Sequence, residues 1–152
     1  NAPVDDSTWT GAASLSGKVN IGKDDVRWMA LYGNLGRYVA LHFANDAILN
    51  SSGEIESIDG YAGFIAYRHQ WVGSWRSTLA YAMQSYDNDT SLSASSNAYS
   101  PNKSSWSVLG NLFYSPLPKL DIGAEYRYGE RELENGTDGD FNRLQFTTKY
   151  SF

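Results

Sequence analysis

Hydrophobic and polar residues alternate along most of this chain with a period of two. Near the carboxy-terminal end, Leu144, Phe146 and Tyr150 fall on one parity, and Arg143 and Lys149 fall on the other. A period of two is that of a β-strand with two unlike faces. Such a strand fits a half-solvated soluble sandwich, or a membrane barrel with an apolar face in lipid and a basic face in the lumen.

The alternation predicts eight strands, separated by connections rich in Gly, Pro, Ser, Asn and Asp. These strands cover residues 9–21, 26–32, 37–44, 61–71, 75–86, 106–114, 120–128 and 143–152. Short connections lie at 22–25, 33–36, 72–74 and 115–119, and long polar ones at 45–59, 87–104 and 129–141.

The lengths of the connections are sorted along the chain. Those after predicted strands two, four and six are short, and those after strands three, five and seven are long. Short turns on one side and long loops on the other are typical of outer-membrane barrels, and an even strand count places both chain ends on the periplasmic side. The short turn at 22–25 is the one exception. We therefore predict an all-β fold, an antiparallel transmembrane β-barrel with eight strands in a single domain, residues 1–152.

Composition agrees with this fold class. The chain has no cysteine, which excludes disulfides and thiolate metal sites. Its mean hydropathy of -0.46 does not exclude the membrane, because a spanning strand alternates and never forms a long apolar run. The chain begins with Asn-Ala-Pro-Val and no basic, apolar leader. We expect a mature product, or a piece of something longer, from which any signal peptide has been removed.

Acidic and basic residues are distributed differently. Of the 17 acidic residues, only Asp121 and Glu125 fall within predicted strands. Seven basic residues within the predicted strands lie on the parity opposite the aromatic one. They are Lys18, Arg27, Arg68, Arg76, Arg127, Arg143 and Lys149. A basic residue on the lipid face costs about 2–4 kcal/mol near the midplane, so we predict that these seven, with Glu125, line a pore and bind anions.

A basic, partly desolvated lumen concentrates anions, although the net charge of the chain is -5. The alternative is a filled interior, because an eight-stranded barrel is only wide enough to pack its own side chains. Seven cations and two carboxylates do not neutralise each other, and this imbalance favours a water-filled interior.

Other candidate chemistry is sparse. Tyr and Trp gather near the predicted strand ends, as in the aromatic girdles of membrane barrels. His42 and His69 have no partner spacing that suggests a metal site or a catalytic triad. We therefore predict no enzyme activity, no cofactor and no metal. The acidic connections argue against nucleic acid as a partner.

Two stretches carry a family resemblance. They are Tyr-Ser-Pro-Leu-Pro-Lys-Leu-Asp-Ile-Gly-Ala-Glu-Tyr-Arg-Tyr-Gly-Glu-Arg-Glu-Leu-Glu-Asn-Gly at 114–136 and Arg-Leu-Gln-Phe-Thr-Thr-Lys-Tyr-Ser-Phe at 143–152. Residues 16–22 and 33–38 continue the likeness upstream. The chain resembles the DcaP-like porins of Gram-negative bacteria.

This resemblance implies a trimeric, sixteen-stranded porin of the bacterial outer membrane that takes up anionic small molecules, dicarboxylates among them. Its surroundings would be outer-membrane lipid and lipopolysaccharide. Eight predicted strands would form the carboxy-terminal half of such a barrel, and the net positive lumen favours this interpretation. The alternative is a closed eight-stranded barrel that acts as a structural anchor or as an adhesin through its acidic loops.

Overall fold

The computed structural model describes residues 6–35, 46–49, 54–88 and 101–152. The described part of the chain contains β-strands and turns, and no helix in it is long and apolar enough to cross a membrane. The strands are β1 (Ala12–Ile21), β2 (Asp24–Asn34), β3 (Ala47–Leu49), β4 (Ile55–Ser57), β5 (Asp59–Gln70), β6 (Trp75–Asp87), β7 (Asn102–Leu117), β8 (Leu120–Leu133) and β9 (Asp138–Tyr150).

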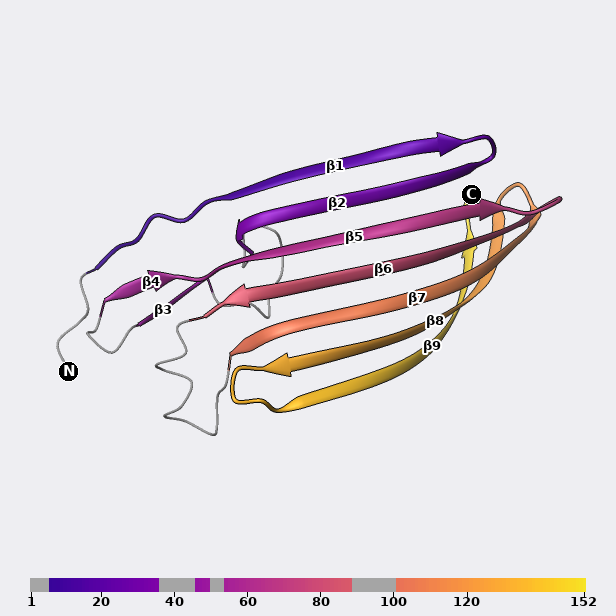
Figure 1. Cartoon of the computed structure of the whole chain (residues 1–152). Helices are drawn as coiled ribbons and strands as arrows, with labels where there is room; N and C mark the ends of the chain where they lie inside the picture. The colour runs from indigo at the N-terminus through magenta and orange to yellow at the C-terminus, as the bar shows by residue number, and fades with distance from the viewer. Residues whose placement is uncertain (1–5, 36–45, 50–53, 89–100) are drawn as a thin grey trace.

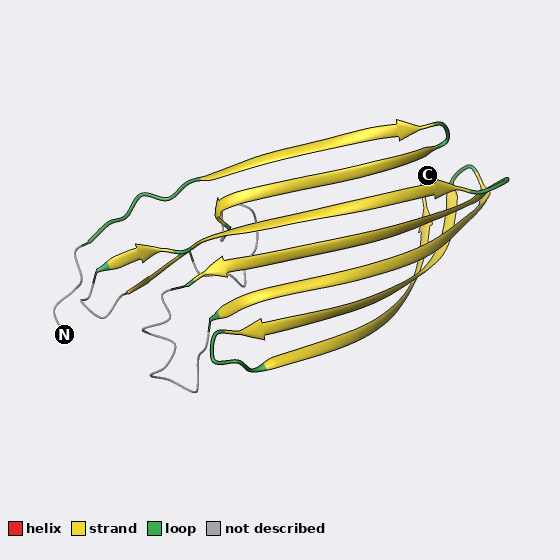
Figure 2. Cartoon of the chain, viewed as in Figure 1, coloured by secondary structure: helices red, strands yellow, loops and turns green. Residues whose placement is uncertain are grey.

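Seven of these strands form one curved sheet in the order β1-β2-β5-β6-β7-β8-β9, and every neighbouring pair is antiparallel (Figures 1 and 2). The strands β3 and β4 pair separately as a short hairpin. The long strands β1 and β9 lie at opposite edges of the large sheet. The all-β, antiparallel class predicted from the alternation is confirmed.

The predicted order of strands needs one correction. The strand expected at 37–44 lies outside the described residues, and β2 pairs directly with β5, from Asp25 opposite Arg68 to Asn34 opposite Asp59. The large sheet therefore has seven strands, and the connection predicted at 45–59 contains β3 and β4. Alternation detects a strand but does not say which strand it pairs with, and this is why the direct pairing of β2 with β5 was not predicted.

This pairing also corrects the predicted positions of the turns. The β1–β2, β5–β6 and β7–β8 turns all lie at one end of the sheet, beside the end of β9 (Figure 1). We call this the short-turn end and the other the long-connection end. The turn after β1 is thus no exception to the sorting. The prediction that both chain ends lie on one side was wrong for these strands, because β1 begins at the long-connection end.

Strands β7, β8 and β9 are longer than the sequence predicted. The region 129–141, predicted as a loop, continues β8 to Leu133 and starts β9 at Asp138, with a tight turn between them. In that turn the Leu133 amide donates to the Thr137 carbonyl over 2.8 Å, and Gly136 has a positive φ of 80°. Charged residues alternate here in place of apolar ones, so the hydrophobic signal ended before the strands did.

Aromatic side chains mark two levels on one face of the sheet. The rings of Trp75 and Tyr114 stack at 4.6 Å near the short-turn end, and Trp106 lies 5.6 Å from Tyr128 toward the other end. Trp106 and Tyr114 are eight residues apart in β7, which is about 27 Å along a strand. With the strand tilt of about 40° found in membrane barrels, this corresponds to about 20 Å of membrane depth, close to the usual apolar band.

Large apolar residues between these levels share that face. Leu79, Leu144 and Phe146 are 61%, 62% and 76% exposed. Among the described residues only Leu35, Ile58 and Tyr86 are buried hydrophobic residues. A sheet with so small an interior core depends on an apolar medium to cover its outer face.

Candidate functional site

All eight residues predicted to bind anions lie on one face of the sheet, opposite the face that carries the aromatic levels. Residues directly opposite in neighbouring strands share a face. One continuous row of such pairs crosses all seven strands: Lys18, Arg27, Ala66, Ala80, Leu109, Arg127 and Arg143. Arg68 and Glu125 lie on the next row of the same face, and Arg76 and Lys149 lie on rows nearer the short-turn end. Their role in lining a pore stays a prediction.

The basic residues of β1, β2 and β5 converge on Asp25. The Asp25 carboxylate lies 2.8 Å from Arg27 Nε, 2.6 Å from Arg68 Nη2 and 3.9 Å from Lys18 Nζ. The side chain of Asp25 is 1% exposed, whereas those of its three partners are 38–50% exposed. One buried carboxylate thus holds three cationic side chains that remain partly exposed to solvent.

Asp25 was not among the residues predicted to lie on the charged face. The residue was predicted to lie in the turn at 22–25, but β2 begins at Asp24 and brings Asp25 opposite Arg68. Its parity, the same as that of Arg27, was the signal that could have found it. The charged face therefore holds three carboxylates with the seven predicted cations, and these ten residues carry a net charge of +4 rather than the +5 expected from seven cations and two carboxylates.

A second group lies at the short-turn end. The Asp121 carboxylate accepts from Arg76 through both oxygens, at 3.1 Å and 3.0 Å, and also from the Ser115 hydroxyl at 2.5 Å. The Arg76 guanidinium lies 5.0 Å from the centroid of the Phe113 ring. Lys149 lies directly opposite Asp121 across β8 and β9. A two-point ion pair and an aromatic ring hold Arg76 in one orientation.

A third group lies on β8 and β9. Arg127 and Arg143 are directly opposite each other, and each places Nη2 3.7 Å from the same oxygen of Glu125. This separation is longer than a hydrogen bond, so both guanidinium groups keep donors for another acceptor. The two arginine side chains are 33% and 51% exposed.

An apolar cluster covers the same face at the long-connection end. Leu35, Ile58 and Tyr86 pack together against Leu31 and Ala62. The Asn34 side-chain amide donates to the carbonyl oxygens of Asp46 (2.6 Å) and Ile58 (3.1 Å). These contacts fasten Asp46 and Ile58, both in the β2–β5 connection, to Asn34 at the end of β2. No periodicity marks single residues such as Leu35, and the sequence analysis did not single them out.

His69 lies on the aromatic face. Its Nδ1 is 2.9 Å from the Asp24 carboxylate, and its ring meets Trp71 edge-on at 4.4 Å. The Tyr67 hydroxyl also donates to Asp24. This arrangement joins a polar cluster to aromatic rings, as expected at a membrane–water interface. His42 lies outside the described residues.

A curved antiparallel sheet with an aromatic, apolar face and a charged opposite face is typical of the wall of an outer-membrane β-barrel. The chain belongs to the DcaP outer membrane protein family, whose model matches residues 5–152. The protein is accordingly located in the bacterial outer membrane.

The fold is similar to that of one solved structure, the outer membrane channel DcaP of Acinetobacter baumannii. The TM-score is 0.81 at 24% sequence identity, over 93% of this chain and 40% of that one. The chain thus spans about two fifths of the length of the channel it matches. A comparison with curated proteins gave no match.

Proposed function

We propose that this chain forms part of the wall of a passive channel that takes up small anionic solutes, dicarboxylates among them. The observation that carries the proposal is the charged face, where the seven predicted cations meet three carboxylates across one continuous sheet. Fixed positive charge beside low-dielectric walls raises the local concentration of anions and disfavours cations. No step of this uptake requires bond-making chemistry.

The three carboxylates position the basic groups rather than cancel them. Asp121 and Ser115 hold Arg76, and Glu125 lies between Arg127 and Arg143 at a distance that leaves both with free donors. Guanidinium groups held in this way offer a planar fork to a solute carboxylate. A dicarboxylate has two such ends and can bridge neighbouring arginines.

The basic residues on the row form two groups. Lys18 and Arg27 lie on β1 and β2, and Arg127 and Arg143 on β8 and β9. Arg27 and Arg127 are four strand spacings apart, about 19 Å along the row. In a barrel with strands tilted by about 40°, they would differ by about 12 Å in depth. A permeating anion would then meet the two groups one after the other.

The two edge strands of the sheet are evidence that the complete protein forms a larger barrel. β1 and β9 each pair on one side only among the described strands, and unpaired backbone groups in hydrocarbon cost several kcal/mol each. We propose that residues 1–152 are one half-barrel unit, closed by further strands in the complete protein. A closed barrel of these strands alone would need β1 beside β9. Trimeric assembly, and contacts with lipid and lipopolysaccharide, belong to this proposal through the family resemblance.

The proposal can be tested by solute uptake into liposomes that contain the complete protein. Succinate should enter faster than putrescine, a dication of similar size. Replacing both Arg127 and Arg143 by Gln should reduce this preference several-fold. Lys103→Gln is a matched control, because Lys103 pairs with Glu132 at 2.7 Å on the opposite face. Equal uptake of the two solutes by the unmodified protein would overturn the proposal.

A further inference from the structure

We propose that Arg131 and Phe141 form a separate binding subsite at the long-connection end, for carboxylates that carry an apolar group. This inference rests on the proposed function, because the subsite lies on the charged face and would act on solutes that enter the channel. Neither residue was predicted to bind anions, because 129–141 was predicted to be a loop.

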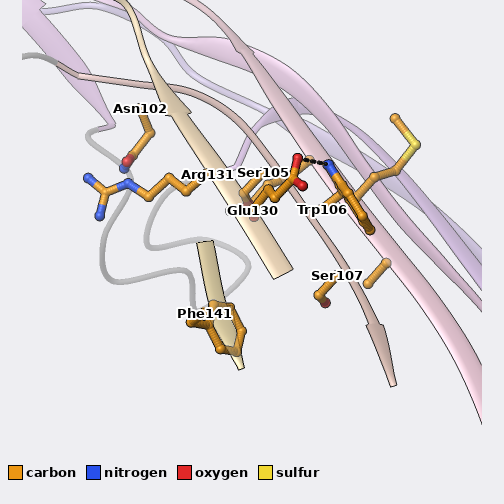
Figure 3. Close-up of a pocket in the computed structure, with 10 residues that line it drawn as sticks. Asn102, Ser105, Trp106, Ser107, Glu130, Arg131 and Phe141 are labelled. Carbon is orange, nitrogen blue, oxygen red and sulfur yellow. Dashed lines mark hydrogen bonds between the residues drawn. The ribbon is translucent and has the colours of Figure 1, made fainter. Parts of the chain in front are cut away.

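The subsite is a hollow of about 390 Å³ between β6, β7, β8 and β9 (Figure 3). A hollow of this size is large enough for a small organic ligand. The side chains that line it from the charged face are Ala82, Gln84, Ser105, Ser107, Arg131 and Phe141. Glu130 and Trp106 also border it, but they lie on the aromatic face and hydrogen-bond to each other at 3.2 Å (Figure 3).

The Arg131 guanidinium is available to a ligand. Within the described part of the chain it has no carboxylate partner within 4.0 Å, in contrast to Arg127 and Arg143, which share Glu125. Ser105 lies directly opposite Arg131, and its hydroxyl accepts from the Gln84 side-chain amide at 2.8 Å. A solvent-accessible guanidinium beside polar, uncharged side chains is suited to a solute carboxylate.

A glycine opposite Phe141 sets the position of its ring. A Cβ atom at Gly129 would lie 2.6 Å from the Phe141 ring, so the ring rests directly on this glycine. Gly129 is buried beneath it, while Phe141 remains 47% exposed. One face of the ring is therefore covered by backbone and the other is open to the hollow. An apolar group of a ligand can lie against that open face.

Arg131 and Phe141 are diagonal neighbours on β8 and β9, since Arg131 is opposite Gly139 and Phe141 is opposite Gly129. Diagonal neighbours are about 7–8 Å apart at Cα, a span that a single small ligand can bridge. Arg131 is four residues beyond Arg127 along β8, about 13 Å nearer the long-connection end. A solute that enters from that end reaches this subsite before it reaches Arg127.

The experiment records blockage of single-channel current in the complete protein, with acetate and cyclohexanecarboxylate added on the long-connection side. The unmodified channel should retain cyclohexanecarboxylate longer than acetate. Arg131→Gln should weaken blockage by both carboxylates. Phe141→Ala should shorten the retention of cyclohexanecarboxylate by about three- to tenfold, so that it no longer differs from that of acetate. Lys103→Gln should leave both unchanged. Heat-dependent migration in SDS gels shows whether each variant is folded.

The Phe141→Ala variant uncovers Gly129, so a second variant keeps the ring. Ala82→Leu fills the hollow from β6 and should likewise reduce retention of cyclohexanecarboxylate, with acetate little changed. Loss of the preference in these variants supports the subsite. An unchanged preference in folded Ala82→Leu channels, or unchanged blockage by both carboxylates in folded Arg131→Gln channels, would overturn it, while anion selectivity itself could persist. A channel without anion selectivity would instead contradict the proposed function.

Discussion

Asp25 pairs with more of the basic residues on the charged face than any other described carboxylate does. It is the most enclosed ionisable side chain of this face, and three cations from three strands depend on it. The two other carboxylates are only partly enclosed, with 31% exposure for Asp121 and 25% for Glu125. Neutralising Asp25 should therefore change both the charge of the face and the cohesion of β1, β2 and β5.

We expect Asp25→Asn to increase the preference for anions and to lower stability. The free charge rises by one, and Lys18, Arg27 and Arg68 lose the group that screens their mutual repulsion. Reversal potentials measure the first effect, and the temperature at which the folded band disappears in SDS gels measures the second. Asp138→Asn removes an exposed carboxylate on the opposite face and should change neither. A decrease in anion preference for Asp25→Asn would contradict this role.

At the scale of single strands, parity determines which substitutions are tolerated. Leu79 and Ala80 are adjacent in β6, midway between the aromatic levels, but they face opposite sides of the sheet. Leu79→Arg should cost about 2–4 kcal/mol of folding free energy in a bilayer. Ala80→Arg should cost much less, because it adds a cation to the row of Arg27 and Arg127. Urea titrations of folding into lipid vesicles compare the two, and equal costs would mean that the faces are assigned wrongly.

The pairing of β1 with β2 depends on one glycine. Gly33 has a φ of 114°, and a Cβ there would lie 2.3 Å from the Gly11 carbonyl oxygen. That oxygen accepts a 2.9 Å hydrogen bond from the Asn34 amide. Gly33→Ala should therefore destabilise this end of the hairpin by about 1–3 kcal/mol. Gly11→Ala, with open space around it, should have little effect in the same titration. Equal stability of the two variants would show that the close approach is not required.

The sequence predicted strands well where apolar and polar residues alternate, and less well elsewhere. Tyr61, Ile65 and Tyr67 located β5 to within two residues at its start, because one face of that strand is apolar. The prediction of a loop at 129–141 was wrong, because these ends of β8 and β9 carry charged residues and lack the alternation of apolar and polar residues. The shared face of the cations followed from parity, whereas the ion pairs of Asp25, Asp121 and Glu125 depend on inter-strand register, which no single strand specifies.

At the scale of the whole molecule, the open edges of β1 and β9 require partners. The described strands would present a row of unpaired backbone groups at each edge within the bilayer. We therefore expect the polypeptide extracted from outer membranes to be much heavier than the 16.9 kDa of these 152 residues. Mass spectrometry of the denatured, purified chain decides this. A mass of 16.9 kDa in a folded, monomeric barrel would contradict the half-barrel unit.

The sign of the charge on the charged face leads to a prediction for the complete protein. The chain as a whole has a net charge of -5, so its total charge would favour cations, while the face that we assign to the pore has the opposite sign. Whether the total charge or the charged face determines ion selectivity therefore decides the sign of the reversal potential.

The most direct measurement is the reversal potential of the complete protein in a planar bilayer under a tenfold gradient of potassium chloride. Our account predicts the sign that corresponds to chloride permeating faster than potassium, and a shift toward zero when Arg127 and Arg143 are replaced by Gln. A reversal potential of the opposite sign, with potassium permeating faster, would contradict the assignment of the charged face to the pore.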